Sequence, residues 1–219
     1  MITILSCEHY SNHVPPEFDY LFEKGQEVLE SHRGYDVRVE HLFHALSPFF
    51  DYCFHFPISR LLIEPNRSLH NRHLFSPFSL HLPKSERTRL IAQFYHPYRK
   101  SIEQCIGNHD GEPIVHISAH SFTPVLGNQN RESEIGLLFD PGNTPEKELA
   151  KLWKRELNKL SSARVRFNYP YRGKADGLTT YLRKCFPTNY SGIELEVRND
   201  KIFELSNSIV DSLQNLFET

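Results

Sequence analysis

The sequence predicts an α/β protein: a three-layer sandwich in which helices cover a mixed, mostly parallel central sheet, as in phosphorylase/hydrolase-like folds. Three observations favour this class. The chain has 219 residues, 39% of them hydrophobic, which is enough to bury a full core. Short apolar runs alternate with amphipathic segments of helical period. No repeat or linker interrupts them, so we expect residues 1–219 to form one domain.

The first half of the chain predicts two strands and a helix. The run ITILSC at residues 2–7 is rich in β-branched residues and is typical of a buried strand. A helix should begin near Asp36 and end at Pro48, because one face carries Val39, Leu42, Phe43 and Leu46. The run RLLIEPNRS at residues 60–68 predicts a second strand that continues into a polar loop.

The middle of the chain predicts a long loop and a long helix. Residues 70–84 show no period and contain two prolines, so we expect an irregular surface loop, a kind of segment that is often functional. Residues 85–109 have helical character, and Pro97 should kink this helix or divide it in two.

The second half of the chain alternates strands and helices more regularly. The segment TPEKELAKLWKRELNKL predicts an amphipathic helix with Thr144 as its cap, Pro145 in its first turn and Leu149, Leu152 and Leu157 on one side. Strands are expected in 112–124, 134–141, 163–173 and 191–200, and helices in 177–185 and 201–217.

Charge and cysteine usage exclude several classes of protein. The 25 basic and 27 acidic residues nearly cancel, which argues against a nucleic-acid-binding protein held by bulk electrostatics. No apolar run approaches the roughly 20 residues of a membrane span. The start, MITILSCEH, lacks the features of a signal peptide, and the four cysteines are scattered without a paired spacing. We therefore expect a cytoplasmic protein without nucleic-acid or membrane partners.

Polar side chains recur where the predicted strands end. His9 follows the first strand, Asn66 and Arg67 follow the second, His120 lies near the end of the third, and Glu196 lies in the last. Ligands of open α/β sheets bind beyond the carboxyl ends of the strands. We therefore expect these side chains to meet in one cleft.

Two histidines and a carboxylate would supply three of the four ligands of a catalytic zinc ion. For the carboxylate we favour Asp36, which a helix could return to the tip of the first strand, although a helix N-cap explains this residue equally well. Glu8 and Asn12 are the alternatives: Glu8 should point to the opposite face from His9, and the Asn12 amide is a poor zinc ligand. Glu196 would then be free to transfer protons.

Ordered motifs over nearly the whole chain resemble the N-formylglutamate amidohydrolase family. SCEHYSNHVPPEF is similar to the family's opening PHAG-x-x-x-P element, with His9 at its histidine, and GYDVRVEHLF to the segment that supplies an aspartate, here Asp36. LLIEPNRS resembles D-x-NR with Glu64 in place of the aspartate, and FYHPYRKSI resembles Y-x-PYH. The glutamate at position 64, together with differences in the later motifs, indicates a divergent branch of the family.

The later motifs continue the same order. ISAHSF is similar to D-x-HS, with Ser118 where an acid often stands, and NYPYRGKADGLTTYLRK loosely resembles N-x-x-x-KGG-x-I-T-R. GIELEVRND resembles the strand that carries QLE, with Glu196 at its glutamate. The family's fold is distantly related to that of zinc carboxypeptidases, which place an Asn-Arg pair near the substrate and a catalytic glutamate in a late strand.

The resemblance implies a metal-dependent hydrolase that cleaves the amide bond of an N-formyl or N-acyl amino acid such as N-formylglutamate. It implies Glu196 as the catalytic residue, a zinc ion or another divalent metal on His9, Asp36 and His120, and substrate binding by Asn66, Arg67 and Arg172. An ion pair with Glu64 is the alternative role for Arg67. Alternative functions are a peptidase- or cell-wall-amidase-like hydrolase and a non-catalytic carboxylate-binding descendant. The oligomeric state stays open.

Overall fold

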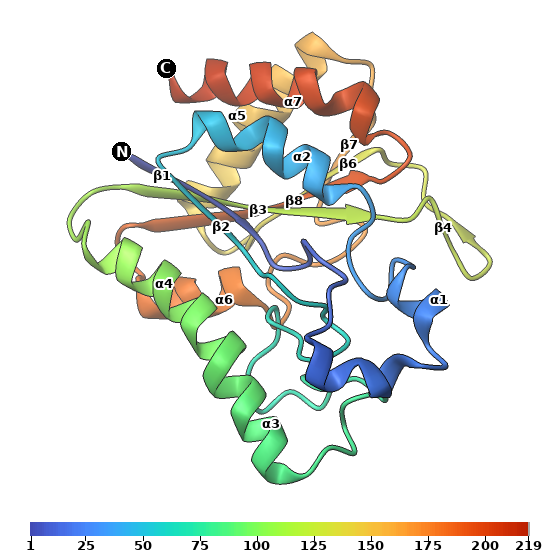
Figure 1. Cartoon of the computed structure of the whole chain (residues 1–219). Coiled ribbons are helices and arrows are strands. Elements are labelled where there is room, and N and C mark those ends of the chain that lie inside the picture. Colours follow the sequence, from blue (N-terminus) through green and yellow to red (C-terminus); the bar gives the residue numbers. More distant parts are fainter. Residues whose placement is uncertain (219) are drawn as a thin grey trace.

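A computed structural model describes residues 1–218, and within them six strands form one sheet in the order β2–β1–β3–β8–β6–β7 (Figure 1). The strands are β1 (Ile2–Cys7), β2 (Tyr52–His55), β3 (Ile114–Phe122), β6 (Ile135–Leu138), β7 (Val165–Phe167) and β8 (Tyr190–Arg198). The first four in this order are parallel, whereas β6 runs antiparallel to β8 and parallel to β7. The predicted mixed, mostly parallel α/β fold is confirmed.

Helices lie on both faces of this sheet. On one face α2 (Val39–Leu46), α5 (Thr144–Leu160) and α7 (Ile202–Phe217) pack together, and on the other lie α4 (His96–Gly107) and α6 (Leu178–Cys185) (Figure 1). Each face has its own apolar core: Trp153 is buried in the first and Phe56 in the second. Because helices cover both faces, β3 is buried along its whole length, although its sequence IVHISAHSF places His116, Ser118 and His120 between apolar residues.

The second strand is not where the sequence predicted it. Residues 60–68 form turns, and the strand that pairs with β1 is the exposed segment Tyr52–His55. The apolar run Leu61–Ile63 is nevertheless buried, because it packs into the core beneath α4. Ser59 closes the turn: its carbonyl accepts a hydrogen bond from the Leu62 amide and its hydroxyl accepts one from Leu61. Such side-chain hydrogen bonds compete with strand pairing.

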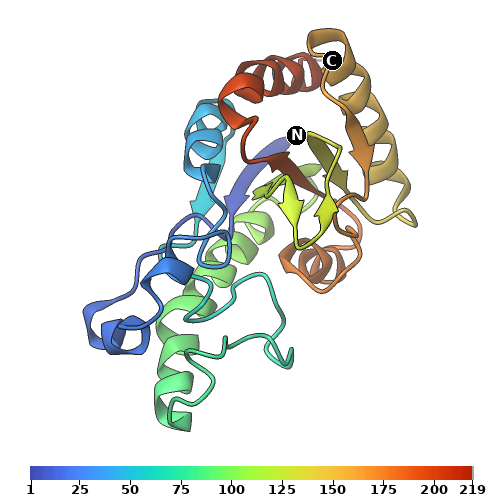
Figure 2. The ribbon, with the colours of Figure 1, turned by 90° about the vertical axis from the view of Figure 1, so that its right-hand side faces the viewer.

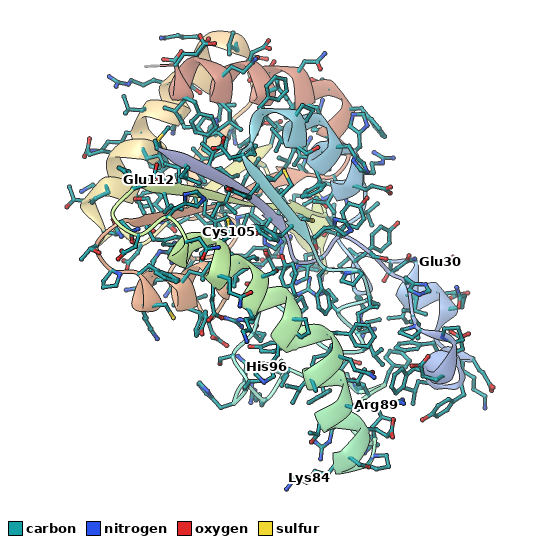
Figure 3. The ribbon with its side chains drawn as sticks, turned by 60° about the vertical axis from the view of Figure 1, so that its left-hand side comes forward. Glu30, Lys84, Arg89, His96, Cys105 and Glu112 are labelled. Atoms are coloured by element: carbon teal, nitrogen blue, oxygen red, sulfur yellow. The ribbon has the colours of Figure 1, made fainter. Side chains whose placement is uncertain are left out.

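The helix around Pro97 is divided as predicted. It consists of α3 (Lys84–Leu90), a π-helical segment η3 (Ile91–Tyr95) and α4, which follow one another as a nearly continuous rod (Figure 3). Pro97 lies in the first turn of α4 but follows helical residues, so the preceding segment has to accommodate its missing N–H. The wider π-helical turn precedes the proline and so takes up the change in hydrogen bonding.

Smaller elements complete the chain. They are the short helical segments η1 (Pro16–Phe22), α1 (Gln26–Leu29) and η2 (Ser47–Phe49), and a hairpin of β4 (Val125–Leu126) and β5 (Gln129–Asn130). Residues 70–83 form the expected irregular loop. None of the helices within residues 1–218 is long and apolar enough to cross a membrane.

The predicted details of α5 need two corrections. Its cap is Asn143, whose side-chain oxygen accepts a hydrogen bond from the Glu146 amide at 3.2 Å, and not Thr144. Its buried face carries Ala150, Trp153 and Leu157, whereas Leu152 is 42% exposed. The large indole of Trp153 determines which side of the helix faces the core, and its Nε1 donates to the Ser212 hydroxyl on α7.

Candidate active site

The site lies where the parallel strands end, on the side of the molecule that faces the reader in Figure 2. His9 follows β1, His120 lies near the end of β3, and Glu196 lies in β8 directly opposite His120 in the strand register. Asp36 precedes α2, and its backbone amide donates to the carbonyl of His9 at 2.9 Å. Because β1, β3 and β8 are parallel neighbours, their carboxyl ends bring these side chains to one edge of the sheet.

His9, Asp36 and His120 form a compact buried cluster. Each contributes one ligand-type atom, and these atoms all lie within 4.8 Å of one another. Nδ1 of His120 is 3.0 Å from Oδ2 of Asp36, and Nδ1 of His9 is 3.4 Å from Oδ1 of the same carboxylate. The two imidazole centroids are 4.9 Å apart. The carboxylate therefore bridges both histidines.

Two further buried carboxylates contact the imidazoles, each at the Nε2 atom that points away from Asp36. Nε2 of His9 lies 2.7 Å from Glu64 Oε1, and Nε2 of His120 lies 3.0 Å from Glu8 Oε2. Because a carboxylate only accepts, each Nε2 carries the hydrogen and each Nδ1 is directed at Asp36. Histidines that bind metals in proteins are commonly held by a carboxylate in this way.

Glu8 is fixed by an extensive network. Its Oε1 accepts hydrogen bonds from the Ser6 hydroxyl at 2.6 Å and the Tyr98 hydroxyl at 2.7 Å, and its Oε2 accepts one from Ser118. Glu8 therefore holds His120 at its Nε2 atom and does not join the His9–Asp36–His120 cluster. Asn12, the other alternative third ligand, is not among the residues that line the pocket at this cluster.

The electrostatics of the cluster reflect its mixture of acids and bases. Burial alone would raise the pKa of Asp36, but its two histidine neighbours hold that pKa well below the usual range. Burial likewise opposes the charged form of His120, yet hydrogen bonds to Asp36 and Glu8 raise its pKa well above the ordinary value. In the absence of a cation, His120 therefore carries a proton between two carboxylates. A cation at Nδ1 would replace that proton.

Glu196 has the opposite character. Burial is the main reason that its pKa rises to about 8, and the carboxylates of Asp36 and Glu194 raise it further while His120 and Arg131 oppose them. Its Oε2 is buried and has no hydrogen-bond partner among residues 1–218. Such a group can hold a proton and release it near neutral pH.

A pocket of about 470 Å³ opens onto this cluster. All of the site residues that the sequence predicted line it: His9, Asp36, Asn66, Arg67, His120, Arg172 and Glu196. Asn66 uses its side chain partly for structure, because its Oδ1 accepts a hydrogen bond from the Leu178 amide at the start of α6. Nη1 of Arg67 donates to the Asp176 carbonyl at 2.6 Å and to that of Asn66 at 2.9 Å.

The ion pair considered between Arg67 and Glu64 is not formed. Glu64 instead pairs with Arg60, whose Nε lies 2.7 Å from Glu64 Oε2. Burial alone would raise the pKa of Glu64, but Arg60 and His9 keep it well below the usual range. Nη1 of Arg60 also lies 3.1 Å from His9 Nδ1 and 3.5 Å from Asp36 Oδ1, so this guanidinium borders the cluster directly.

Sequence reasoning missed Arg60, Arg131 and Tyr171, which also line the pocket. Arg60 precedes the apolar run that was interpreted as a strand, so nothing marked it as part of a site. Arg131 follows a hairpin whose four strand residues are all exposed, and a hairpin of this kind leaves no hydrophobic pattern. Tyr171 adjoins Arg172 in the predicted substrate loop, and that proximity was the one available signal.

Glycine allows one close approach behind Glu196. Gly136 in β6 lies opposite Glu196 in the strand register. A Cβ atom there would meet the carbonyl oxygen of Tyr169 at 1.9 Å and the Cβ of Glu196 at 3.2 Å. The segment that leads to Tyr171 can therefore pass over β6 only because residue 136 has no side chain.

Comparison with known proteins gives an independent view of the chain. The model of the N-formylglutamate amidohydrolase family matches residues 2–203. A gene product from Agrobacterium tumefaciens is 26% identical, with a TM-score of 0.81 over 98% of this chain and 91% of that one. N-formylglutamate amidohydrolase from Ralstonia eutropha JMP134 is 17% identical, with a TM-score of 0.71 over 99% and 93% of the two chains. No curated protein matches the chain.

Proposed function

Because the chain belongs to the N-formylglutamate amidohydrolase family, we propose that it hydrolyses the amide bond of an N-formyl or N-acyl amino acid, such as N-formylglutamate, with a divalent metal ion. The observation that supports this most strongly is the buried cluster of His9, Asp36 and His120 with Glu196 beside it in the same pocket. A protein that only bound a carboxylate would need none of these four side chains.

The residues present fit a divalent cation. Two imidazole Nδ1 atoms and a carboxylate converge, and buried carboxylates already hold both Nε2 atoms. This donor set suits zinc, which takes three protein ligands in catalytic sites and leaves the fourth position open. We propose His9, Asp36 and His120 as the ligands. The chemistry that such an ion supplies when bound is polarisation of the substrate carbonyl and a fall in the pKa of water from about 15.7 toward roughly 7.

Glu196 is proposed as the group that moves the proton. Its unpartnered Oε2 accepts a proton from the attacking water and then returns it to the leaving nitrogen. Burial makes the carboxylate a stronger base than an exposed glutamate, because the charged form is poorly solvated. The conservative change Glu196→Gln removes the base and keeps the shape of the side chain.

Arginine side chains provide the remaining roles. Arg60, fixed by Glu64 beside the cluster, is placed to stabilise negative charge that develops on the carbonyl oxygen. One such donor contributes on the order of 3 kcal/mol to catalysis. Arg67 is proposed to bind the substrate carboxylate through its planar fork, and Arg172 is the second residue of this kind in the pocket. Asn66 supports Arg67 through its backbone carbonyl. The expected partner is thus a small acyl amino acid.

The test is a hydrolysis screen with N-formyl and N-acetyl amino acids, with and without a chelator. We expect hydrolysis that a chelator abolishes and added zinc restores. Glu196→Gln should lose turnover and keep its metal, whereas His120→Ala should lose both. Peptide and muropeptide amides in the same panel distinguish the peptidase- and amidase-like alternatives. Normal hydrolysis by the Glu196→Gln protein would refute the assignment of the base, and inactivity on every acyl amino acid would refute the proposed substrate class.

A further inference from the structure

A row of buried polar side chains leads from His120 back into the core of the sheet. His116 in β3 is fully buried, and because side chains alternate along a strand it shares a face with His120, roughly 13 Å away along the strand. Ser6 in β1 and Tyr190 in β8 are buried on the two neighbouring strands. The proposed mechanism uses none of these three groups, although a polar group in a core destabilises the protein unless it is hydrogen-bonded.

Hydrogen bonds connect these groups to Glu8 in one direction. Nδ1 of His116 lies 2.6 Å from the Tyr190 hydroxyl, and its Nε2 lies 2.8 Å from the Ser6 hydroxyl. Burial lowers the pKa of His116 to about 4, so the ring carries a single hydrogen near neutral pH. Because Ser6 donates its hydrogen to Glu8, its oxygen must accept from Nε2 of His116, and Nδ1 accepts from Tyr190. The chain Tyr190–His116–Ser6–Glu8 therefore donates toward the carboxylate at every step.

The contacts of this chain differ from those of buried hydroxyls elsewhere in the protein. Among the buried serines within residues 1–218, the side chains of Ser6 and Ser118 contact only other side chains, and Ser118 also donates to Glu8. The other buried serines donate to backbone carbonyls: Ser59, Ser79, Ser121, Ser133, Ser206 and Ser212. Hydrogen bonds between two side chains are the rarer kind in proteins. A run of them that ends on Glu8 indicates a role for that carboxylate rather than for the local backbone.

A glycine makes room for the start of the chain. Gly192 in β8 lies opposite His116 in the strand register. A Cβ atom at Gly192 would meet the hydroxyl oxygen of Tyr190 at 2.5 Å and two carbons of its ring at 2.9 Å. Tyr190 can therefore fold back over residue 192 toward His116 because that residue has no side chain.

We propose that His116 is a positioning residue of the active site, which fixes the Glu8 carboxylate through Ser6 and thereby the orientation of the His120 ring. The inference rests on the proposed function, in which His120 is a metal ligand. Nε2 of His120 lies 3.0 Å from Glu8, so a movement of that carboxylate changes the direction in which Nδ1 points. Partners that orient a ligand in this way affect metal affinity. His116 does not line the pocket and so acts only through its neighbours.

Metal affinity gives the first test. His116→Leu removes the donor to Ser6 and should weaken zinc binding, measured in competition with a chelator, by roughly 3- to 10-fold, less than the roughly 10- to 100-fold typical of a direct partner of a ligand. His116→Gln should restore most of the affinity, because its amide nitrogen can donate to Ser6 in place of the ring. The double variant Ser6→Ala/His116→Leu should bind zinc about as well as the weaker single variant, because both changes interrupt one chain.

A second measurement follows the His120 ring without metal. In the chelated wild-type protein, the Nε2–H group of His120 is held by Glu8 and should give a proton signal in nuclear magnetic resonance that exchanges slowly with water. The absence of this signal from His120→Ala identifies it. We expect His116→Leu and Ser6→Ala to shift the signal or to speed up its exchange, and His116→Gln to preserve it.

Ser212→Ala is the matched control. It removes a buried hydroxyl that accepts from Trp153 in the core on the other face of the sheet, so it tests the loss of a buried hydrogen bond as such. This variant should change neither the zinc affinity nor the His120 signal. Circular dichroism and thermal unfolding verify that each variant is folded.

The outcomes distinguish a failure of this proposal from a failure of the proposed function. If His116→Leu binds zinc as wild type does and leaves the His120 signal unchanged, the positioning role is refuted. Additive losses in Ser6→Ala and His116→Leu, or an equal loss in Ser212→Ala, would also refute it. If wild type binds no metal but both chain variants change the His120 signal and Ser212→Ala does not, the metal site fails while the positioning role stands.

Discussion

The buried carboxyl of Glu196 should make the stability of the metal-free protein depend on pH. Its pKa of about 8 in the folded protein lies above the ordinary value of 4.5. The folded state therefore holds this proton more tightly than the unfolded state. The contribution to stability is complete below about pH 4.5 and is lost progressively as the pH rises through about 8.

The size of the effect follows from these two values. Between them, each pH unit removes roughly 1.4 kcal/mol from the free energy of unfolding, and the loss levels off above about pH 8. From about pH 6 to about pH 9, Glu196 should therefore destabilise the protein by roughly 2–3 kcal/mol. The Glu196→Gln variant lacks this proton, so its stability relative to wild type should increase by that amount over the same interval.

The assay is urea unfolding of both proteins in the presence of a chelator at several pH values. In thermal unfolding, the same gain corresponds to a rise of roughly 5–10 °C in Tm relative to wild type. Glu27→Gln, which removes an exposed carboxylate on α1, is the control and should not reproduce the trend. A difference between Glu196→Gln and wild type that stays constant from pH 6 to pH 9 would show that the carboxyl is not buried as described.

Three further predictions test other parts of the structure. Glu8→Gln should weaken zinc binding by on the order of 10- to 100-fold in competition with a chelator, because Glu8 orients His120; unchanged affinity would contradict this role. Asn143→Ala should cost about 1 kcal/mol in urea unfolding and Thr144→Ala much less, since Asn143 is the cap of α5; equal costs would be inconsistent with that assignment. Gly136→Ala should lower both Tm and hydrolytic activity, since the new Cβ displaces the Tyr169 backbone; wild-type values for both would disprove the close approach.

The parts of the fold that the sequence predicts well are those in which burial alone determines structure. The strand Ile2–Cys7 is buried over all but its first residue, and its run of apolar and β-branched residues identifies it. The edge strand Tyr52–His55 is mostly exposed and has no such pattern. The apolar run Leu61–Ile63 was misassigned because burial of a turn and burial of a strand leave the same composition.

In the candidate site, too, some residues could be predicted from the order of the strands and helices, and others could not. His9, His120 and Glu196 were predictable because parallel strands place their carboxyl ends together, and that rule requires only the order of elements. The partner of Glu64 was not predictable: the arginine considered as an alternative partner was its near neighbour Arg67, but the chain turns so that Arg60 reaches Glu64. Arg131 is recognisable only in three dimensions, because its burial depends on Phe122 and Tyr171 from separate segments.

The central claim is that two imidazoles and one carboxylate, distant in the sequence, hold a divalent metal ion beside Glu196. The most direct test is to measure the metal content of the purified wild-type protein and of the His120→Ala variant by inductively coupled plasma mass spectrometry. The structure predicts about one equivalent of a divalent metal, zinc in the first place, in wild type and loss of most of it in the variant. Wild-type protein without metal after zinc-supplemented growth, or an undiminished content in His120→Ala, would contradict the account.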